Sequence, residues 1–259
     1  MAANNRCWYR TTMKIATWNV NGIRAREVQF CEWLERDRPD VVCLQELKAE
    51  PAQIPDRCKH VDYHVFWHGL RAYSGVSLHV RKALLEADPQ FTHPDFDMEA
   101  RIVQVALGNM VIASVYVPNG GKDYAAKIGF FTRLAAWTKQ VHDEGRELVL
   151  CGDINVARTD IDVHPRERKA EVIGQRREER EIFESLLGGR MVDVGRAMDP
   201  TNERLFSWWP PWRDMRKRNI GWRIDYILAS NAIAARAKSC VVLADVGTSD
   251  HAPVLLEIG

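Results

Sequence analysis

The chain has 259 residues, of which 46% are hydrophobic, and its 36 Lys and Arg residues against 35 Asp and Glu residues give a formal net charge of +1. A chain of this length and hydrophobic content can bury one large core, so we expect a single domain over residues 13–259. The nearly neutral charge neither requires nor excludes a polyanionic partner, so any polyanion-binding surface must come from local patches.

Residues 1–12 precede the first periodic segment, and we expect them to form a flexible N-terminal extension. They hold no apolar stretch of signal-peptide length, and no apolar run in the chain is long enough to span a membrane. The six cysteines form no CxxC pair, and two lie inside apolar runs, which favours reduced thiols. We therefore expect a soluble monomer in the cytoplasm, associated with the nucleoid if the source is a bacterium.

The first half of the chain reads mainly as short strands. IATWNV and DVVCLQE are β-rich runs, and Phe30, Trp33 and Leu34 share the face of a helix between them before Pro39 ends it. Four further strand-like runs follow, YHVFWH, GVSLHV, RIVQVAL and MVIASVYV, with short polar connections. This pattern predicts a strand, helix, strand unit and then a largely antiparallel meander.

The second half alternates helices with strands. A helix is expected at about residues 123–144, followed by the strand ELVLCGDINV, a charged stretch from His164 to Arg180 and a helix through EREIFESLL. The remaining strand candidates are FSWW, WRIDYILAS, CVVLADV and PVLLEIG. Strands outnumber helices, and the helices cluster between strand groups, which is typical of an α/β fold with two packed sheets covered by helices on the outside.

Polar residues end or interrupt several of these apolar strands. They are Asn19, Glu46, Asp153, Asn155, Asp225, Asp250 and His251. Any one of them alone more often caps a turn, but together they indicate one cleft. Asp153 and Asn155 are two apart and would point to the same face of a strand, whereas Asp250 and His251 are adjacent and would diverge. Oxygen ligands without cysteine suit magnesium or manganese rather than zinc.

Seven segments between about Met13 and Ile258 carry recognisable motifs. They are IATWNVNGIRAR, VVCLQELK, AYSGVSL, VYVPNGG, LVLCGDINVARTDID, GWRIDYILAS and TSDHAPV. Together they resemble the exonuclease III family of abasic-site endonucleases. The strings WN, QE, GDxN and SDH are shared with deoxyribonuclease I and inositol-phosphate phosphatases, whereas VYVPNGG and GWRIDYIL are more specific. The resemblance implies a four-layer αββα sandwich of two mixed, mostly antiparallel sheets, as one catalytic domain over residues 13–259.

For the reaction, the resemblance implies hydrolysis by in-line attack on phosphorus. The metal residues it implies are Asn19, Glu46, Asp153, Asn155, Asp250 and His251, with Glu46 as the main ligand, Mg²⁺ as the ion and Mn²⁺ as a substitute. The catalytic residues it implies are Tyr116, Asp153, Asn155, Asp225 and His251. Asp153, assisted by Asn155, would deprotonate or orient the attacking water. Asp225 would orient His251 and favour imidazolium, and Tyr116 would support the phosphoryl oxygen or leaving group.

For the substrate, the resemblance implies double-stranded DNA with abasic sites or blocked 3′ ends. The DNA-binding residues it implies are Arg24, Tyr73, Asn119, Lys122, Trp208, Trp212, Trp222 and Ile224. Trp208, Trp222 and Ile224 match the wall of an apolar pocket for a flipped-out sugar that has lost its base, and the other polar residues match phosphate contacts. In PPWRDMRKRN, four basic residues surround Trp212, which could wedge into the duplex.

Three positions depart from the family pattern. EVIGQRREER replaces a Phe-containing, Pro-marked turn, which alters the lining of the pocket. Trp208 with Trp209 replaces a Trp-Phe or Phe-Trp pairing, which keeps an aromatic wall but could narrow it. Asn21 stands where some members carry Asp. Because Asn21 removes one carboxylate, we predict a single tight metal site and a second that is occupied only weakly.

The leading prediction is a DNA-repair phosphodiesterase that cuts 5′ to abasic sites, leaves a 3′-hydroxyl and also has some 3′ to 5′ exonuclease and 3′-phosphodiesterase activity. One alternative is a mainly 3′ to 5′ exonuclease with weak abasic cutting, if the altered pocket is too tight. Another is a non-DNA phosphoester hydrolase on the same fold, which VYVPNGG and GWRIDYIL disfavour. A non-catalytic DNA-binding module is disfavoured because every catalytic position is present.

Several other features are expected to be structural. Core packing is the prediction for Trp8, Trp18, Trp33, Trp67 and Trp137. His60, His64 and His68 recur every four residues, but their segment has strand character, so a strand face is favoured over a zinc site. The run RERKAEVIGQRREER is expected to form a solvated surface with ion pairs, with DNA contact as the alternative.

Overall fold

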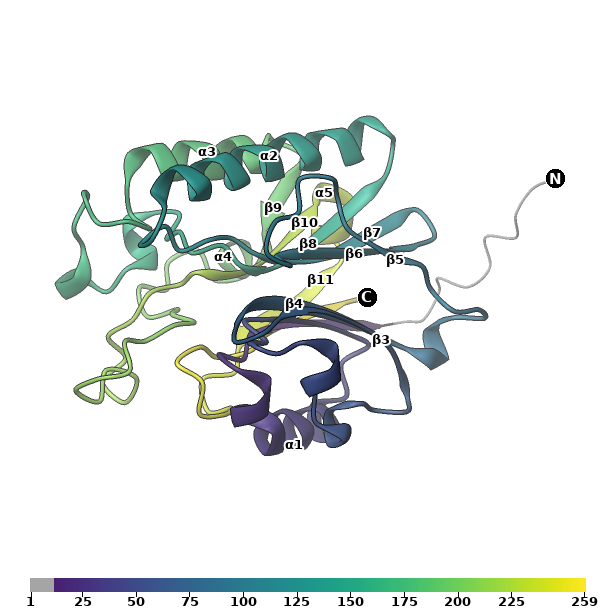
Figure 1. The fold of residues 1–259 in the computed structure, drawn as a ribbon. Coiled ribbons are helices and arrows are strands. Elements are labelled where there is room, and N and C mark those ends of the chain that lie inside the picture. The colour runs from purple at the N-terminus through teal and green to yellow at the C-terminus, as the bar shows by residue number, and fades with distance from the viewer. Residues whose placement is uncertain (1–11) are drawn as a thin grey trace.

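Two six-stranded sheets face each other at the centre of the computed structural model, which describes residues 12–259 (Figure 1). The first sheet has the order β11-β12-β1-β2-β4-β3. Its strands are β1 (Met13–Asn19), β2 (Val41–Gln45), β3 (Tyr63–Leu70), β4 (Tyr73–Arg81), β11 (Ala237–Val242) and β12 (Val254–Ile258). The second sheet has the order β5-β6-β7-β8-β10-β9. Its strands are β5 (Phe91–Thr92), β6 (Ile102–Leu107), β7 (Met110–Tyr116), β8 (Glu147–Asp153), β9 (Met191–Asp193) and β10 (Asp225–Ser230).

Helices cover the outer faces of both sheets and complete the predicted four-layer sandwich. The helices are α1 (Glu27–Asp37), α2 (Tyr124–Asp143), α3 (Arg177–Leu187), α4 (Val194–Met198) and α5 (Asn231–Ala234). Figure 1 shows α1 below the first sheet and α2 with α3 above the second. Short 3₁₀ turns lie in the connections: η1 (Ile23–Arg26), η2 (Pro51–Gln53), η3 (Asp56–Cys58), η4 (Lys82–Leu84), η5 (Asp160–Asp162) and η6 (Pro165–Glu167).

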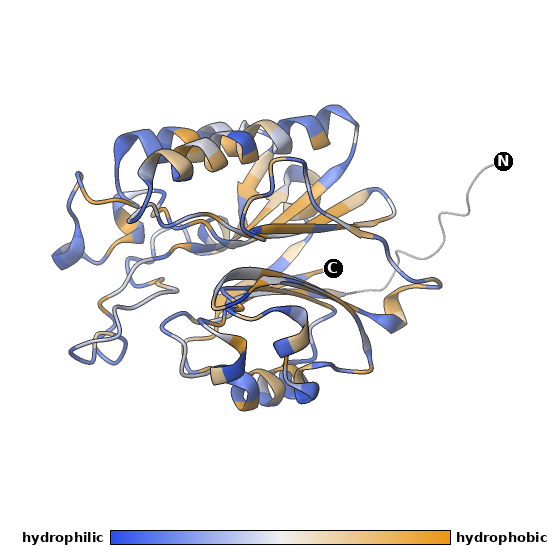
Figure 2. Ribbon diagram, viewed as in Figure 1, coloured by the Kyte–Doolittle hydropathy of each residue, from blue (hydrophilic) through white to orange (hydrophobic). Residues whose placement is uncertain are grey.

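Apolar side chains fill three layers, one between the sheets and one under each group of helices. The central layer includes Ile15, Leu78 and Val149, all fully buried. Helix α3 shows how a sequence pattern builds an outer layer, since Phe183 and Leu186 lie three apart on one face and both are buried. Burial of each such side chain contributes roughly 1.5–3 kcal/mol. Figure 2 shows the hydrophobic strands between more hydrophilic helices.

The fold contains two parallel strand pairs, each joined by a helix. β1 and β2 are parallel and are connected through α1, as the strand, helix, strand pattern predicted, and β7 and β8 are parallel and are connected through α2. Every other strand pairing named here is antiparallel. Because the carboxyl ends of parallel neighbours meet at one edge, the loops after β1 and β2 lie together in the first sheet, and those after β7 and β8 lie together in the second.

The expected meander is wrong in its connectivity. β3 and β4 form a hairpin in the first sheet, whereas β6 and β7 form a hairpin in the second, so the chain changes sheet between Arg81 and Phe91, where β5 begins. The segment FSWW forms no named strand and makes only isolated bridges, from Trp208 to Trp222 and to His251. The strand expected from Trp222 starts instead at Asp225. The short elements β5, β9, α4 and α5 were not predicted.

Other expectations concern the termini and cysteines. The predicted extension at residues 1–12 lies almost entirely outside the described residues, as do Cys7 and Trp8. The cysteines that the structure describes, Cys31, Cys43, Cys58, Cys151 and Cys240, are free and buried. Within residues 12–259, no helix has both the length and the apolar character needed to cross a bilayer.

Candidate active site

Strand ends from both sheets meet at one edge of the sandwich. Asn19 ends β1 and lies beside Glu46, which directly follows the parallel strand β2. In the second sheet, Tyr116 at the end of β7 pairs with Asp153 at the end of β8. β10 runs antiparallel to β8 and begins with Asp225 opposite Asp153. The topology therefore brings together side chains that lie more than 200 residues apart in sequence.

Asn19 links the two sheets. Its side-chain amide donates to Glu46 Oε1 at 3.1 Å and to Asp153 Oδ2 at 2.9 Å. The hydroxyl of Tyr116 donates to the same Glu46 oxygen at 2.8 Å. Burial and the charges of Glu46 and Asp153 hold the pKa of Tyr116 well above its usual range, so the hydroxyl remains a proton donor.

Asp153 and Asn155 do lie together, but not through strand alternation. β8 ends at Asp153, and Asn155 has a left-handed backbone with φ of 54°. The turn directs the Asn155 amide N–H to Asp153 Oδ1 at 2.9 Å and its side-chain nitrogen to Val117 O at 2.9 Å and Asp153 Oδ2 at 3.3 Å. A turn in which a side-chain carboxylate accepts from the backbone two residues on thus replaces the predicted strand geometry.

A carboxylate holds His251, and a hydroxyl in turn holds that carboxylate. Its Nδ1 lies 2.9 Å from Asp225 Oδ2, which also accepts from the Ser207 hydroxyl at 2.7 Å. Burial alone would lower the pKa of His251, but the adjacent Asp225 raises it to about 10. The Asp225 carboxylate therefore favours the imidazolium form of His251, whose Nε2 lies 3.9 Å from Asp153 Oδ2.

Negative charge at the centre of the site is only partly balanced. Burial raises the pKa of Asp153 to about 8, and Asp225 and Glu46 add to this shift while His251 opposes it. Glu46, Asp153 and His251 place ligand atoms within 4.8 Å of one another, and this is the only such group among residues 12–259. Carboxylates and an amide without thiolates suit a hard divalent cation. A cation here would also stabilise the ionised form of Asp153, so the residues present fit a metal.

Asp250 lies outside that group and faces away from His251, as their adjacency predicted. Its two oxygens accept from Asn21 Nδ2 at 2.7 Å and from Trp208 Nε1 at 3.0 Å. Lys48 Nζ lies 2.8 Å from Glu46 Oε2 and donates to Asn21 Oδ1 at 2.6 Å. An ammonium group and an amide therefore join Glu46 to Asp250, where a second cation would otherwise be expected.

An aromatic wall adjoins His251. The rings of Trp208 and Trp222 meet edge to face with centroids 5.7 Å apart, and Trp208 lies 6.4 Å from the His251 ring. Ile224 is buried behind them. Gly174 touches this wall, since a Cβ atom there would lie 3.0 Å from the Trp222 ring. The divergent EVIGQRREER segment thus contacts the wall through its glycine.

The predicted phosphate contacts lie on the rim. Arg24, Tyr73, Asn119 and Lys122 are all exposed. Arg24 donates to the backbone of Lys48 at 3.3 Å, and the Tyr73 hydroxyl accepts from Arg101 at 3.0 Å. The structure therefore places these four side chains outside the buried cluster, on the surface that surrounds it.

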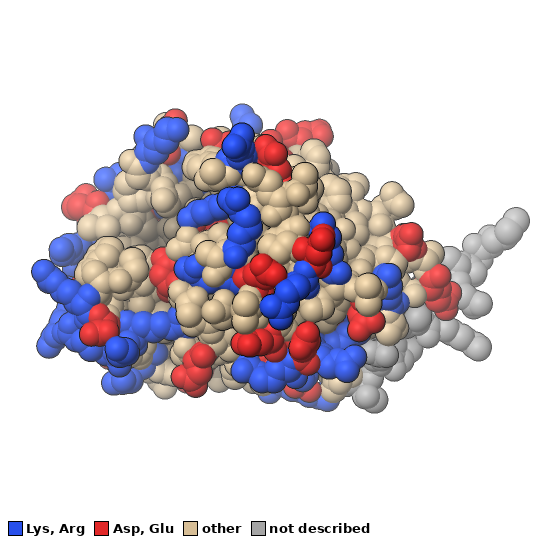
Figure 3. Space-filling view, turned by 60° about the horizontal axis from the view of Figure 1, so that its bottom comes forward, with Lys and Arg blue, Asp and Glu red and all other residues tan. Residues whose placement is uncertain are grey.

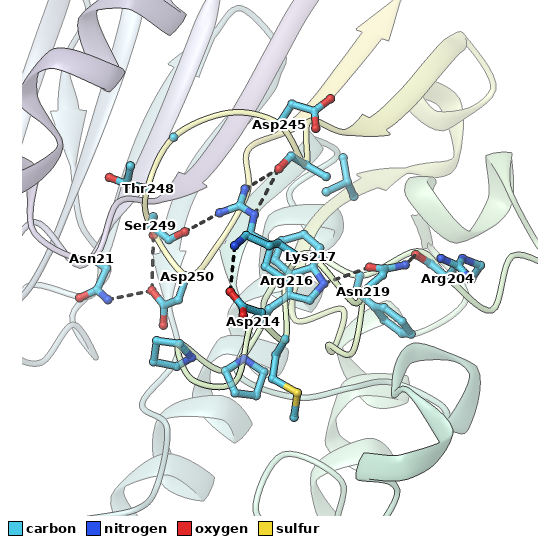
Figure 4. Close-up of a pocket in the computed structure, with 18 of the residues that line it drawn as sticks. Asn21, Arg204, Asp214, Arg216, Lys217, Asn219, Asp245, Thr248, Ser249 and Asp250 are labelled. Carbon is cyan, nitrogen blue, oxygen red and sulfur yellow. Dashed lines mark hydrogen bonds and ion pairs between the residues drawn. The ribbon is translucent and has the colours of Figure 1, made fainter.

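The Trp212 loop, residues 210–219, is fixed to the neighbouring segment by an arginine (Figure 4). Arg216 donates to the carbonyls of Ala244 at 2.7 Å, Val246 at 3.0 Å and Ser249 at 2.5 Å, and its guanidinium lies 4.8 Å from the Trp209 ring centre. These contacts line a groove of about 850 Å³ beside Asp250. Arg216 is thus committed to the protein, which corrects its assignment to a basic DNA-facing loop.

The other side chains of this loop differ in exposure. Trp209 is 2% exposed, whereas Trp212 is 56% exposed. Arg213, Lys217 and Arg218 are also exposed. In Figure 3, Lys and Arg side chains gather at the left end of the molecule, where this yellow-green loop lies in Figure 1. The loop therefore presents one aromatic ring among positive charges.

Several contributing residues have no motif that marks them. Ser207 anchors Asp225, and Arg101 places its guanidinium 4.8 Å from the Tyr116 ring centre while being buried itself. The available signal for Arg101 was a charged residue that opens an apolar strand, RIVQVAL. Lys127 and Glu179 form a buried ion pair that sequence analysis did not identify.

Most of the residues that were expected to have purely structural roles do have them. Trp18, Trp33 and Trp137 are buried, and Trp67 is partly buried. His64 and His68 lie in β3 and pair with acids rather than with one another, at 3.3 Å to Asp88 and 2.5 Å to Asp97. The charged run does form surface ion pairs, such as Arg177–Glu181, but Glu179 within it is fully buried and departs from the predicted solvated surface.

Comparisons with known proteins agree with this geometry. The model of the Endonuclease/Exonuclease/phosphatase family matches residues 16–251. An exodeoxyribonuclease from Bacillus subtilis is 33% identical over 255 residues, which cover 95% of this chain and 99% of that protein.

Two solved structures share both fold and sequence with the chain. A 3′-5′ exonuclease from Neisseria meningitidis superposes with a TM-score of 0.86 at 31% identity, over 95% of this chain and 99% of that one. An AP endonuclease from Archaeoglobus fulgidus gives a TM-score of 0.84 at 30% identity, over 94% and 98% of the two chains. These similar proteins are named for different activities, so similarity alone does not choose between end trimming and internal cleavage.

Proposed function

We propose that this chain, which belongs to the Endonuclease/Exonuclease/phosphatase family, is a DNA-repair hydrolase that cuts the backbone 5′ to abasic sites and leaves a 3′-hydroxyl. Some 3′ to 5′ exonuclease and 3′-phosphodiesterase activity accompanies this cut. The observation that carries the proposal is the cluster of Glu46, Asp153 and His251 ligand atoms within 4.8 Å of one another, directly beside the Trp208–Trp222 wall. Phosphodiester chemistry and an apolar sugar pocket require these two features side by side.

Magnesium is the proposed cofactor, with manganese as a substitute. A divalent cation supplies charge neutralisation and polarisation of the phosphate in such sites. Glu46 would be its main ligand, with Asn19, Asp153, Asn155 and Asp250 around it, and the protonated His251 would lie beside the ion without coordinating it. The ammonium of Lys48 lies 2.8 Å from Glu46 and supports a single tight site, because it already neutralises that side of the carboxylate.

Asp153 is proposed to orient and deprotonate the attacking water. Burial raises its pKa in the metal-free protein, and a bound cation would keep the carboxylate ionised, so that it could accept a proton from the water. Asn155 contacts both Asp153 oxygens and would keep the carboxylate and the water in line with phosphorus.

His251 and Tyr116 are proposed to stabilise the charge that develops on the phosphate. His251 carries a proton that Asp225 favours, and the Tyr116 hydroxyl is a donor held at Glu46. Preorganised donors of this kind act most strongly where water is excluded, and both residues are buried. Asp225 positions His251 and does not itself need to reach the substrate.

Double-stranded DNA with abasic sites or blocked 3′ ends is the proposed substrate, acted on by a monomer. Trp208, Trp222 and Ile224 would form the sugar pocket, and a sugar without a base leaves the helix at low cost. Arg24, Tyr73, Asn119 and Lys122 would contact phosphates on the rim. Trp212, exposed among basic residues, would insert into the duplex.

The direct test is cleavage of an end-labelled duplex with one abasic-site analogue, against the same duplex without it, in magnesium or in chelator. A single magnesium-dependent nick at the lesion, with a 3′-hydroxyl product end, is expected. Ladders from the 3′ end without that nick would support the exonuclease instead.

The exonuclease alternative is favoured by the similarity to the Neisseria meningitidis 3′-5′ exonuclease and to the Bacillus subtilis exodeoxyribonuclease. Trp208→Ala separates the two activities because it opens the aromatic wall. If the native wall is too tight for an internal sugar, this variant gains abasic cleavage. If the wall grips that sugar, the variant loses abasic cleavage and retains end trimming.

A further inference from the structure

Lys127 of α2 and Glu179 of α3 form an ion pair that the reaction does not use. The Lys127 Nζ lies 2.5 Å from Glu179 Oε1, and both side chains are 0% exposed. Removal of two charges from water costs about as much as their attraction returns, so an apolar pair of similar volume would serve stability as well. The charges are therefore better explained by what each partner holds in place.

Lys127 holds the backbone next to Asp153, the residue proposed to activate the attacking water. Its ammonium donates to the carbonyl of Asn155 at 2.8 Å and to that of Asn119 at 3.4 Å. Its stem packs on Gly120, where a Cβ atom would lie 2.8 Å from Lys127 Cδ. The left-handed turn at Asn155, which brings its side chain to Asp153, is thus anchored by a buried cation.

Glu179 holds the backbone behind the sugar pocket. Its Oε2 accepts from the amide of Gly174 at 2.7 Å and from that of Arg176 at 3.1 Å. The Gly174 carbonyl accepts in turn from Ala157 at 2.7 Å. Gly174 lies against Trp222, so the carboxylate fixes the segment that supports the aromatic wall.

We propose that Lys127 and Glu179 are a positioning pair, which fixes Asn155 at the phosphate and Gly174 behind Trp222 relative to each other. Attack geometry and sugar recognition are then set by one buried contact between two helices. The catalytic part of this inference rests on the function proposed above.

The test is the double variant Lys127→Met/Glu179→Met, which removes both charges and keeps side-chain length. It leaves no unpaired buried charge, so the protein is expected to fold. The carbonyl of Asn155 and the amides of Gly174 and Arg176 lose their partners. Since small misplacements near the reacting atoms cost about 100-fold, we expect kcat on the abasic duplex to fall about 100-fold while KM changes less than about threefold.

A matched control removes an exposed ion pair on α3, the helix that carries Glu179. Arg177 and Glu181 are 92% and 61% exposed and lie 2.6 Å apart. Arg177→Gln/Glu181→Gln is expected to keep kcat and KM. A double Met variant that folds and keeps the wild-type kcat would overturn the proposal, since the pair would then only compensate charge.

If the double Met variant does not fold, Glu179→Gln is used, because it is isosteric, keeps one acceptor oxygen, and leaves a lysine that can become neutral by losing its proton. The ammonium of Lys127 loses its anchor, so kcat is expected to fall at least tenfold on the basis of the same geometric sensitivity. Wild-type kcat in this variant would equally overturn the proposal.

Amide hydrogen exchange separates this proposal from the proposed function, because it needs no substrate. In the double Met variant, exchange within residues 172–176 is expected to become faster than in the wild type, because the amides of Gly174 and Arg176 lose their acceptor. In Glu179→Gln the increase is expected to be smaller, because a neutral amide oxygen is a weaker acceptor than a carboxylate, and the control pair leaves exchange unchanged. Unchanged exchange in whichever of the two variants folds would overturn the positioning role. Absence of cleavage by the wild type would contradict the proposed function alone.

Discussion

Two clusters of buried charge lie next to β10 and differ in balance. The arginine cluster consists of Asp162, Asp193, Arg196 and Arg223. Arg223 donates to Asp162 at 2.8 Å and to both oxygens of Asp193 at 2.8 and 2.7 Å, and Arg196 donates to Asp162 at 2.7 Å. Burial would raise the pKa of Asp162, but Arg223 holds it below its usual range. Two cations thus satisfy two carboxylates.

The carboxylate cluster consists of Glu46, Asp153, Asp225 and His251. Its member Asp225 lies only two residues after Arg223 of the arginine cluster. His251 is shared by three carboxylates, and the pKa of Asp153 rises to about 8 because burial is not fully compensated. We infer that the balanced arginine cluster supports the fold, and we propose that the unbalanced carboxylate cluster binds a cation and a phosphate.

The largest expected effect follows from Asp225→Asn, which alters the carboxylate cluster without changing its shape. His251 loses the charge that keeps it protonated, so kcat should fall by about 10³–10⁴-fold, as when the orienting carboxylate of a catalytic histidine is removed elsewhere. Single-turnover cleavage of the abasic duplex measures this effect. Asp193→Asn in the arginine cluster is the control, and it should retain kcat; equal losses in both variants would erase the distinction between the clusters.

The reverse experiment is Arg223→Met, which alters the arginine cluster. Asp193 is left buried without its main partner, and removal of one member of a buried pair costs about 3–5 kcal/mol of the free energy of unfolding. Urea denaturation measures the change. A loss below about 1 kcal/mol would mean that Arg223 contributes little to the fold.

Magnesium should stabilise only the carboxylate cluster. At 100 times its dissociation constant, a ligand that binds only the folded state adds about 2.7 kcal/mol. Thermal unfolding of the wild type should therefore shift upward with magnesium, and Glu46→Gln should abolish most of that shift. An equal shift in both proteins would place the cation elsewhere.

The two clusters should also respond to pH with opposite sign in metal-free protein. The pKa of Asp153 is about 8 in the folded state, against an ordinary value of 3.8. Between pH 4 and pH 8 the folded protein therefore holds a proton on Asp153 that the unfolded chain has lost. The free energy of unfolding accordingly rises as the pH falls from 8 to 4. Asp162 has a lowered pKa, so its contribution is present above its ordinary pKa and is lost as pH falls below about 4. Each proton contributes at most about 1.4 kcal/mol per pH unit.

Denaturation midpoints of metal-free wild type and Asp153→Asn between pH 4 and 8 test this pH dependence. The wild type should lose stability toward pH 8, and the variant should show a flatter profile. A wild-type profile that rises toward pH 8 as steeply as that of the variant would contradict the uncompensated charge at Asp153.

Most of the carboxylate cluster could be predicted from sequence because its residues stand at strand ends. Asn19 and Glu46 follow apolar runs whose parallel pairing a strand, helix, strand pattern already implies. Motif resemblance supplied the long-range grouping that no local pattern contains. The prediction that Asn155 lies beside Asp153 was right, but its reason, strand alternation, was wrong. The left-handed turn at Asn155 that brings the two side chains together leaves no mark in an alternating sequence pattern.

The Lys127–Glu179 pair was missed because Glu179 stands in a run of charges that resembles a solvated helix face. A helical signal was nevertheless present: Glu179, Phe183 and Leu186 lie four and three residues apart on one face, and all three are buried. The passage of the chain from the first sheet to the second after β4 had no such signal, because the sequence pattern of a hairpin does not indicate to which sheet its strands belong.

The most direct test of this account measures stability and cleavage together in Asp153→Asn. If Asp153 is an uncompensated carboxylate kept for catalysis, the metal-free variant at pH 8 should unfold at the same or a higher temperature than the wild type, and its magnesium-dependent nick at the abasic site should disappear. A variant that nicks at the wild-type rate, or one that unfolds at a clearly lower temperature, would contradict the central claim.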